Sequence, residues 1–235
     1  MAMKYLQDEY LGSFYYDTKM WLYLIGANGP MLRLKKDYKG PISLPKGIIN
    51  CYSMFSGIDF TGCWFEDFDT SDVENMTCMF YDCKFPEGFT LGNAFNTSNV
   101  ESMSGMFQNC KLPEGFTLGD AFDTSNVEYM SGMFQNCKLP EGFTLGNNFS
   151  TGNVINMKEM FSGCEFPEGF TLGDAFDTSN VKYMWRMFYA CRLPEGFTLG
   201  SKFSTGNVIN MNEIFYKCDF SESFTRYLGI LPTVR

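Results

Sequence analysis

The stretch that decides the fold is FNTSNVESMSGMFQNCKLPEGFTLGDA, residues 95–121, because residues 122–148 repeat it almost letter for letter as FDTSNVEYMSGMFQNCKLPEGFTLGNN. The same spacing of 27 runs along the chain in the cysteines Cys83, Cys110, Cys137, Cys164, Cys191 and Cys218. A fixed period of this length is typical of proteins built from stacked units, none of which can bury its apolar side alone. The sequence therefore predicts one array of repeats.

The array begins before its regular part, since residues 48–55 align with residues 73–80 at an offset of 25. We predict repeats over 44–218, with an N-terminal cap at 1–43 and a C-terminal cap at 219–235 that cover the apolar ends of the stack. Within the first cap, two apolar segments flank Gly26-Ala27-Asn28-Gly29-Pro30, which indicates a hairpin. Alternatively, residues 1–43 form a small partner-binding module, because this segment is rich in interface-type aromatic residues: Tyr5, Tyr10, Phe14, Tyr15, Tyr16 and Trp21.

Each repeat carries two conformational signals. Phe89-Thr90-Leu91 alternates apolar and polar residues, the period of a strand. Ser98 followed by Glu101 has the form of a helix capping box. The apolar residues that follow lie at spacings of 3, 4 and 3, which is one face of a short helix: Val100, Met103, Phe107 and Cys110. We therefore predict a strand and a short helix in every repeat, with neighbouring strands hydrogen-bonded at about 4.8 Å.

The segments FNTSNVESMSGMFQNC (95–110) and FDTSNVEYMSGMFQNC (122–137) closely resemble the BspA-like branch of leucine-rich repeats. The resemblance covers about residues 44–229 and implies an α/β repeat solenoid, leucine-rich-repeat-like, with parallel strands on one face and short helices on the other. It also implies a protein that binds partners, since the family consists largely of bacterial surface or secreted proteins, including adhesins. The N-terminus, in which Asp8 and Glu9 interrupt the apolar residues, does not have the form of a signal peptide, which favours a cytoplasmic location.

Composition argues against an enzyme and against nucleic acid as a direct partner. The chain contains no histidine, the commonest general base and metal ligand. Its 18 Lys and Arg against 27 Asp and Glu give a net charge of −9, which disfavours nucleic acid or an anionic membrane as the main partner. The longest apolar run, Met20 to Ile25, is far shorter than the roughly 20 residues that insertion across a membrane needs. We expect no catalytic residue, no cofactor and no metal site. The cysteine row shares the apolar stripe of phenylalanine and methionine, so we expect buried thiols, whereas Cys51, Cys63 and Cys78 are either paired or free.

Two polar rows are the candidate binding site. The alternation of Phe-Thr-Leu turns one threonine per repeat outward, and a glutamate of the Pro-Glu-Gly turn accompanies it. The residues are Glu87, Thr90, Glu114, Thr117, Glu141, Thr144, Glu168, Thr171, Glu195 and Thr198. Either the glutamates are copied turn chemistry, or they form an acidic face for a basic partner. Trp185 and Arg186 replace the Ser-Gly of earlier repeats and form a candidate contact anchor.

These observations predict a non-enzymatic scaffold that binds another protein through an extended face; if the glutamates form an acidic face, that protein has a basic surface. The resemblance adds a bacterial surface adhesin as one alternative. An alternative of a different class is an acidic inhibitor, of the phage or mobile-element type, that occupies the basic groove of a nucleic-acid-binding protein. Salt sensitivity and competition by DNA or RNA would separate the second hypothesis from the first.

Overall fold

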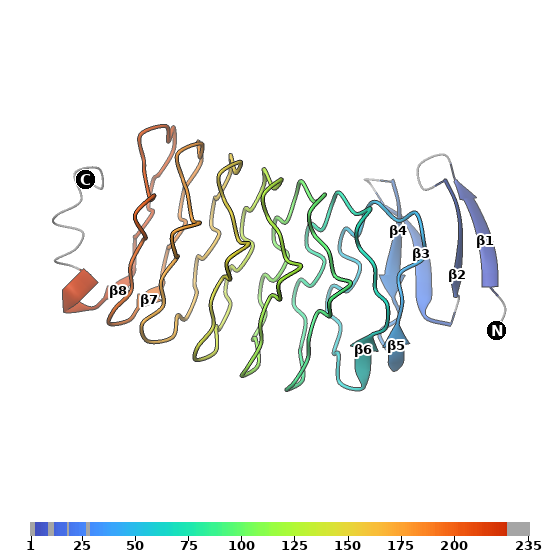
Figure 1. Cartoon of the computed structure of the whole chain (residues 1–235). Coiled ribbons are helices and arrows are strands. Elements are labelled where there is room, and N and C mark those ends of the chain that lie inside the picture. Colours follow the sequence, from blue (N-terminus) through green and yellow to red (C-terminus); the bar gives the residue numbers. More distant parts are fainter. Residues whose placement is uncertain (1–2, 9–11, 18, 27–28, 225–235) are drawn as a thin grey trace.

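The computed structural model describes residues 3–8, 12–17, 19–26 and 29–224 and shows a row of stacked coils with strands at both ends (Figure 1). Two antiparallel pairs come first: β1 (Met3–Asp8) with β2 (Gly12–Asp17), and β3 (Trp21–Gly26) with β4 (Gly29–Leu34). Two parallel pairs join coils: β5 (Gly40–Ile42) with β6 (Cys63–Phe65), and β7 (Arg192–Leu193) with β8 (Asp219–Phe220). The β3–β4 pair lies where the sequence indicates a hairpin.

Parallel bridges between equivalent residues hold the coils in register. One row of bridges runs through Asn50, Asn75, Ser102, Tyr129, Asn156, Tyr183 and Asn210. A second row runs through Asp59, Lys84, Lys111, Lys138, Glu165 and Arg192. Each step is 25 residues at the start and 27 later, so the period in the sequence is the length of one coil.

The short helix predicted in every repeat is wrong. Over residues 29–224, all of which are described, the only helical turn is at 222–224. The segment 103–110 instead sends every second N–H to the next coil: Met103 to Tyr129, Gly105 to Ser131, Phe107 to Met133 and Asn109 to Gln135, at 2.8–2.9 Å. The N–H groups of Met106, Gln108 and Cys110 close tight turns within the coil, whereas an α-helix would use every N–H internally.

Two left-handed residues within this segment explain why it cannot be a helix. Gly105 and Asn109 both have φ of 63°, a region that glycine and asparagine tolerate and that interrupts right-handed helix. The same two positions have positive φ in the following coils, for example at Glu159 and Gly163. The apolar spacing survives, because successive tight turns also return Val100, Met103, Phe107 and Cys110 to the inside, where each is at most 1% exposed.

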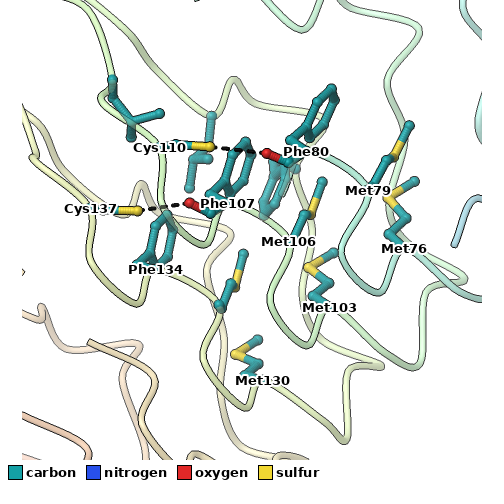
Figure 2. Close-up of a cluster of buried hydrophobic side chains, with 14 of the residues drawn as sticks. Met76, Met79, Phe80, Met103, Met106, Phe107, Cys110, Met130, Phe134 and Cys137 are labelled. Carbon is teal, nitrogen blue, oxygen red and sulfur yellow. Dashed lines mark hydrogen bonds between the residues drawn. The ribbon is translucent and has the colours of Figure 1, made fainter. Parts of the chain in front are cut away.

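The core consists of columns of identical residues. Phe80, Phe107, Phe134, Phe161, Phe188 and Phe215 stack with ring centroids 5.3–5.7 Å apart and interplanar angles of 3–10°. Methionines pack beside this column, as Figure 2 shows for Met103 and Met106, and both are fully buried. The register between coils thus stacks each phenylalanine on the equivalent phenylalanine of the next coil. The many aromatic and sulfur-containing residues of the chain therefore belong mostly to the core.

The cysteine row is buried from Cys83 to Cys191, whereas Cys218 at its end is half-buried, and its thiols are hydrogen-bond donors. Cys110 Sγ lies 3.0 Å from the carbonyl oxygen of Phe80, and Cys137 Sγ lies 2.9 Å from that of Phe107 (Figure 2). All nine cysteines, including Cys51, Cys63 and Cys78, are free thiols. Burial raises the pKa of Cys110 to about 12, so its thiol is protonated at neutral pH. The row therefore links each coil to the preceding one without a covalent bond.

Apolar residues from the two terminal segments cover the ends of this core. Trp21 of β3 is 3% exposed and its ring lies 6.0 Å from that of Phe55 in the first coil. At the other end, Phe224 is buried against Phe215, with ring centroids 5.8 Å apart. The side chains of residues 3–17, which include most of the aromatic residues of the alternative N-terminal module, lie outside the described part, as do residues 225–235. No helix in the described residues is long and apolar enough to cross a bilayer.

The left-handed positions lead to a stability prediction. Ala190 has φ of 55° at the position that Gly163 occupies one coil earlier. A left-handed conformation costs an L-residue about 1–2 kcal/mol, and replacing alanine by glycine removes this strain. The greater freedom of glycine in the unfolded chain offsets about 0.5–1 kcal/mol of the stability gained. We expect Ala190→Gly to raise the free energy of unfolding by up to about 1 kcal/mol in chemical denaturation. Ala94→Gly, at an exposed site without positive φ, is the matched control and should lower it.

Burial leads to a second prediction, about thiol reactivity. Alkylation requires the thiolate, and both burial and a raised pKa make the thiolate scarce at Cys110 and Cys137. A brief iodoacetamide pulse on the native protein at neutral pH should therefore modify the half-buried Cys78 and Cys218 first, as read by peptide mass spectrometry. Denatured protein, in which all nine thiols react, is the control. Early labelling of Cys110 in the native protein would contradict this packing.

Candidate protein-binding surfaces

The two predicted polar rows lie along one edge of the stack, here called the Pro-Glu-Gly edge. It comprises residues 86–92, 113–119, 140–146, 167–173 and 194–200. In each copy the Phe and Leu side chains are buried, as for Phe143 (4% exposed) and Leu145 (5% exposed). The threonine between them and the preceding glutamate are exposed in all five copies. The structure therefore brings ten of the twelve candidate residues together on one edge.

The predicted row of paired strands along this edge is wrong for all but one step. Among these five segments only 167–173 and 194–200 are hydrogen-bonded through the backbone: Gly169 N to Glu195 O at 3.1 Å, and Leu172 N to Thr198 O at 3.3 Å. Two features of each segment limit the strand. Its proline has no N–H to donate, and glycines with φ near 70–80°, such as Gly115 and Gly119, leave only three residues between them to extend.

Shallow grooves separate the unpaired coils along the edge. One, of about 320 Å³, lies between residues 142–147 and 167–173. Another, of about 250 Å³, lies between residues 117–120 and 144–148. Main-chain atoms and the exposed Thr117, Thr144 and Thr171 line these grooves. The edge therefore offers backbone groups as well as hydroxyl and carboxylate groups to a partner.

Trp185 and Arg186 lie on the turn segment of their coil, not on the Pro-Glu-Gly edge, and both are half-buried. The Arg186 guanidinium lies 4.6 Å from the Trp185 ring centroid and forms an ion pair with Glu213, which raises the pKa of the arginine. Lys158 Nζ lies 4.4 Å from the same indole ring. The expected anchor is thus part of a cluster in which cations already contact the aromatic faces.

A third surface, here called the acidic groove, was not predicted as a site. It has a volume of about 760 Å³ and is lined by Ile49, Asp72, Glu74, Asn99, Glu101, Asn126, Glu128 and Asn153. Backbone hydrogen bonds place its three glutamates on consecutive coils: Glu101 N donates to Glu74 O at 2.8 Å, and Glu128 N to Glu101 O at 2.9 Å. Their side chains are exposed, and no basic residue lines the groove.

The sequence pattern does not predict the acidic groove, because the spacing of Ser98 and Glu101, and of Ser125 and Glu128, has the form of a capping box. Ser98 is instead in an Asx turn, in which its N–H donates to Asn96 Oδ1 at 2.9 Å, and Ser125 does the same with Asp123 at 2.8 Å. With no helix to cap, Glu101 and Glu128 are free to face solvent. The asparagine or aspartate two residues before each serine was the signal for this turn.

Within the described part of the chain, no three Cys, Asp or Glu residues are grouped so that they could hold a metal ion.

Two overlapping segments, residues 49–165 and 117–227, match the family model described as "Mycoplasma protein of unknown function, DUF285". Together they cover about three quarters of the chain and nearly all of the predicted repeat array. No curated protein and no solved structure matches the chain.

The single paired step of the edge gives a prediction with an internal control. A Cβ on Gly200 would lie 2.8 Å from the carbonyl oxygen of Gly173, whereas a Cβ on Gly146 would meet nothing within 4 Å. Both glycines have positive φ, so either alanine costs about 1–2 kcal/mol in backbone strain. Gly200→Ala must also push two backbones apart and should lower the free energy of unfolding more than Gly146→Ala. Equal losses in chemical denaturation would contradict the close approach at this step.

Proposed function

The chain belongs to this repeat family, whose description assigns no function, and we propose that it is a non-enzymatic protein that binds another protein through the Pro-Glu-Gly edge. The observation that supports this most is the repetition of one exposed glutamate and one exposed threonine on five consecutive coils. An active site would normally differ from the other repeats at one place, whereas a repeated row of identical groups suits an extended contact with another surface.

The charge of the edge favours a partner with a basic surface. The ion pairs among described residues are Lys84–Asp59, Lys138–Glu165 and Arg186–Glu213, and none uses a glutamate of the edge. Equivalent carboxylates on neighbouring coils repel one another by about 1 kcal/mol or less when exposed and screened by salt. Lysine and arginine side chains of a partner would relieve that repulsion, so we expect binding to weaken as the salt concentration rises.

The finer relationship to BspA-like leucine-rich repeats is part of the same proposal. It rests on the motif Phe-x-Thr-Ser-Asn-Val-x-x-Met-x-x-Met-Phe-x-x-Cys, which recurs in residues 95–110 and 122–137 with Ser-Gly between its methionines. Solenoids of this kind bind through extended faces built from equivalent positions of successive repeats.

A charge-reversal series on the edge tests the proposal. The bait protein with Glu114→Lys, Glu141→Lys and Glu168→Lys should lose the host protein that the unchanged bait captures at low salt, as read by quantitative mass spectrometry. The matched control reverses the same number of charges in the acidic groove, with Glu74→Lys, Glu101→Lys and Glu128→Lys, and should keep the partner. The proposed edge is wrong if the groove variant loses the partner and the edge variant keeps it.

Competition with nucleic acid separates the second candidate function from the first. The same row of exposed carboxylates suits an inhibitor that occupies the nucleic-acid-binding surface of a basic protein. For such an inhibitor, added DNA or RNA should release the captured partner. If the partner stays bound in excess nucleic acid, the inhibitor hypothesis is excluded and the general scaffold hypothesis stands.

A further inference from the structure

A surface here called the ladder face is formed by the four residues of each coil that include the first row of parallel bridges, and it contains the three glutamates of the acidic groove. Its members are residues 49–52, 74–77, 101–104, 128–131, 155–158, 182–185 and 209–212. The third residue of each set faces the core, and the other three lie at the surface or partly so. Thr77 Oγ1 and Ser102 Oγ lie 2.8 Å apart on neighbouring coils, so the positions form one continuous surface. The ladder face shares no residue with the Pro-Glu-Gly edge.

Charges on the ladder face are separated by sign along the stack. The four sets at 49–52, 74–77, 101–104 and 128–131 contain three carboxylates, Glu74, Glu101 and Glu128, and no lysine or arginine. The three sets at 155–158, 182–185 and 209–212 contain Lys158 and Lys182 and no aspartate or glutamate. Because the repeats are otherwise near-copies, this separation is a specific divergence between the two halves of one face.

Side-chain size also differs between the two coils 101–104 and 182–185, which carry charges of opposite sign. Ser102 and Ser104 of one coil occupy the positions of Tyr183 and Trp185 three coils later. Large apolar groups are left at the surface on this face: Tyr129 is 44% exposed, Tyr183 43% and Ile209 72%. Exposed aromatic and branched apolar residues on a regular face are typical of an interface.

From this arrangement we infer that the ladder face binds the ladder face of a second copy of the chain, in an antiparallel two-fold dimer. A two-fold axis that lies in the interface, parallel to the bridged segments, reverses the order of the coils. It also places each position of a coil opposite the same position of a coil in the second copy. With the axis between 128–131 and 155–158, six of the seven coils overlap. Lys182 of one copy then lies opposite Glu101 of the other, one coil spacing of about 4.8 Å from both Glu74 and Glu128.

The same operation places the large side chains of residues 182–185 opposite the small ones of residues 101–104. Trp185 of one copy lies opposite Ser104 of the other, and Tyr183 lies opposite Ser102. By symmetry, each contact occurs twice in the dimer. Both copies therefore place Lys182 over the carboxylates of the partner and Trp185 and Tyr183 over its serines. A parallel arrangement would instead place the acidic coils of one copy over the acidic coils of the other, and like charges repel.

The size of the face sets the expected strength. Six coils at about 4.8 Å and four residues at about 3.3 Å give a contact of about 400 Å² per copy. Stable dimers bury about 800 Å² per partner, so this contact is at the weak end and depends on its charges. The flanking charges keep the contrast between the two halves. Asp72 adds a carboxylate beside the acidic half, Arg186 is already paired with Glu213, and Glu159 and Lys217 add one charge of each sign.

Sedimentation velocity over a range of concentrations tests the dimer. The unchanged chain should show a weight-average mass that rises with concentration towards twice the chain mass at low salt and falls to that of the monomer at high salt. The triple variant Glu74→Lys, Glu101→Lys and Glu128→Lys should remain monomeric at low salt, because Lys182 then faces lysines. Adding Lys182→Glu to this triple variant should restore the dimer, because the charges are again complementary.

A direct readout identifies the contact. Zero-length carbodiimide cross-linking of a mixture of normal and nitrogen-15-labelled chains should join Lys182 of one copy to Glu101, or to the flanking Glu74 or Glu128, of the other. The edge variant Glu114→Lys, Glu141→Lys and Glu168→Lys is the matched control and should dimerise as the unchanged chain does. Circular dichroism and thermal unfolding of every variant check that the stack is intact.

Three results would overturn this inference. An unchanged chain that is monomeric at every concentration at low salt excludes the dimer. A dimer that survives the triple reversal, or one that Lys182→Glu fails to restore in a folded protein, excludes this face. The capture experiment on the Pro-Glu-Gly edge is independent of all three, so either proposal can fail alone.

Discussion

Hydrogen bonding of every second backbone N–H to the next coil is the interaction on which the rest of the structure depends. Over residues 103–109 these bonds are 2.8–2.9 Å long and run to equivalent carbonyls one coil further on. They fix the distance between coils and hold them in register, so every other row follows from them. Phe107 stacks on Phe134 at 5.6 Å because the backbones that carry them are already aligned.

Buried polar groups in this stack find hydrogen-bond partners on the next coil, because equivalent groups recur there. Thr97 Oγ1, fully buried, donates to the carbonyl oxygen of Asp123 at 2.7 Å, and equivalent threonines do so in other coils. No buried side-chain nitrogen or oxygen among the described residues lacks a hydrogen-bond partner. A buried unsatisfied group costs about 1–3 kcal/mol, so a fault in one copied position would be multiplied by the number of coils. The near-identity of the repeats is therefore a structural constraint, and the places where they diverge are free to serve binding.

Divergence is concentrated at the surface. The core column at Phe80, Phe107 and Phe134 is unchanged, whereas the position of Ser104 becomes Lys158 and then Trp185. The exposed glutamate of the Pro-Glu-Gly edge is copied without change, which suits one long uniform contact. The ladder face, in contrast, differs between its two halves in charge and in size, which suits a contact with its own reversed copy.

The period, the core and the exposed edge were predictable from the sequence, because they depend only on which residues recur. A spacing of 27 sets the length of a coil, and the alternation in Phe143-Thr144-Leu145 is the same whether or not the segment pairs with its neighbours.

The predicted helix was wrong for a physical reason: apolar spacings of 3, 4 and 3 are produced equally by a helix and by successive tight turns. Only pairing between coils, together with left-handed residues such as Gly105 and Asn109, decides for the turns, and that pairing is a tertiary property. Because turns form in place of a helix, Glu101 and Glu128 cap no helix and instead line the acidic groove. The sequence by itself therefore determined what is buried and what repeats, whereas the tertiary structure decided which backbone groups pair and which carboxylates face solvent.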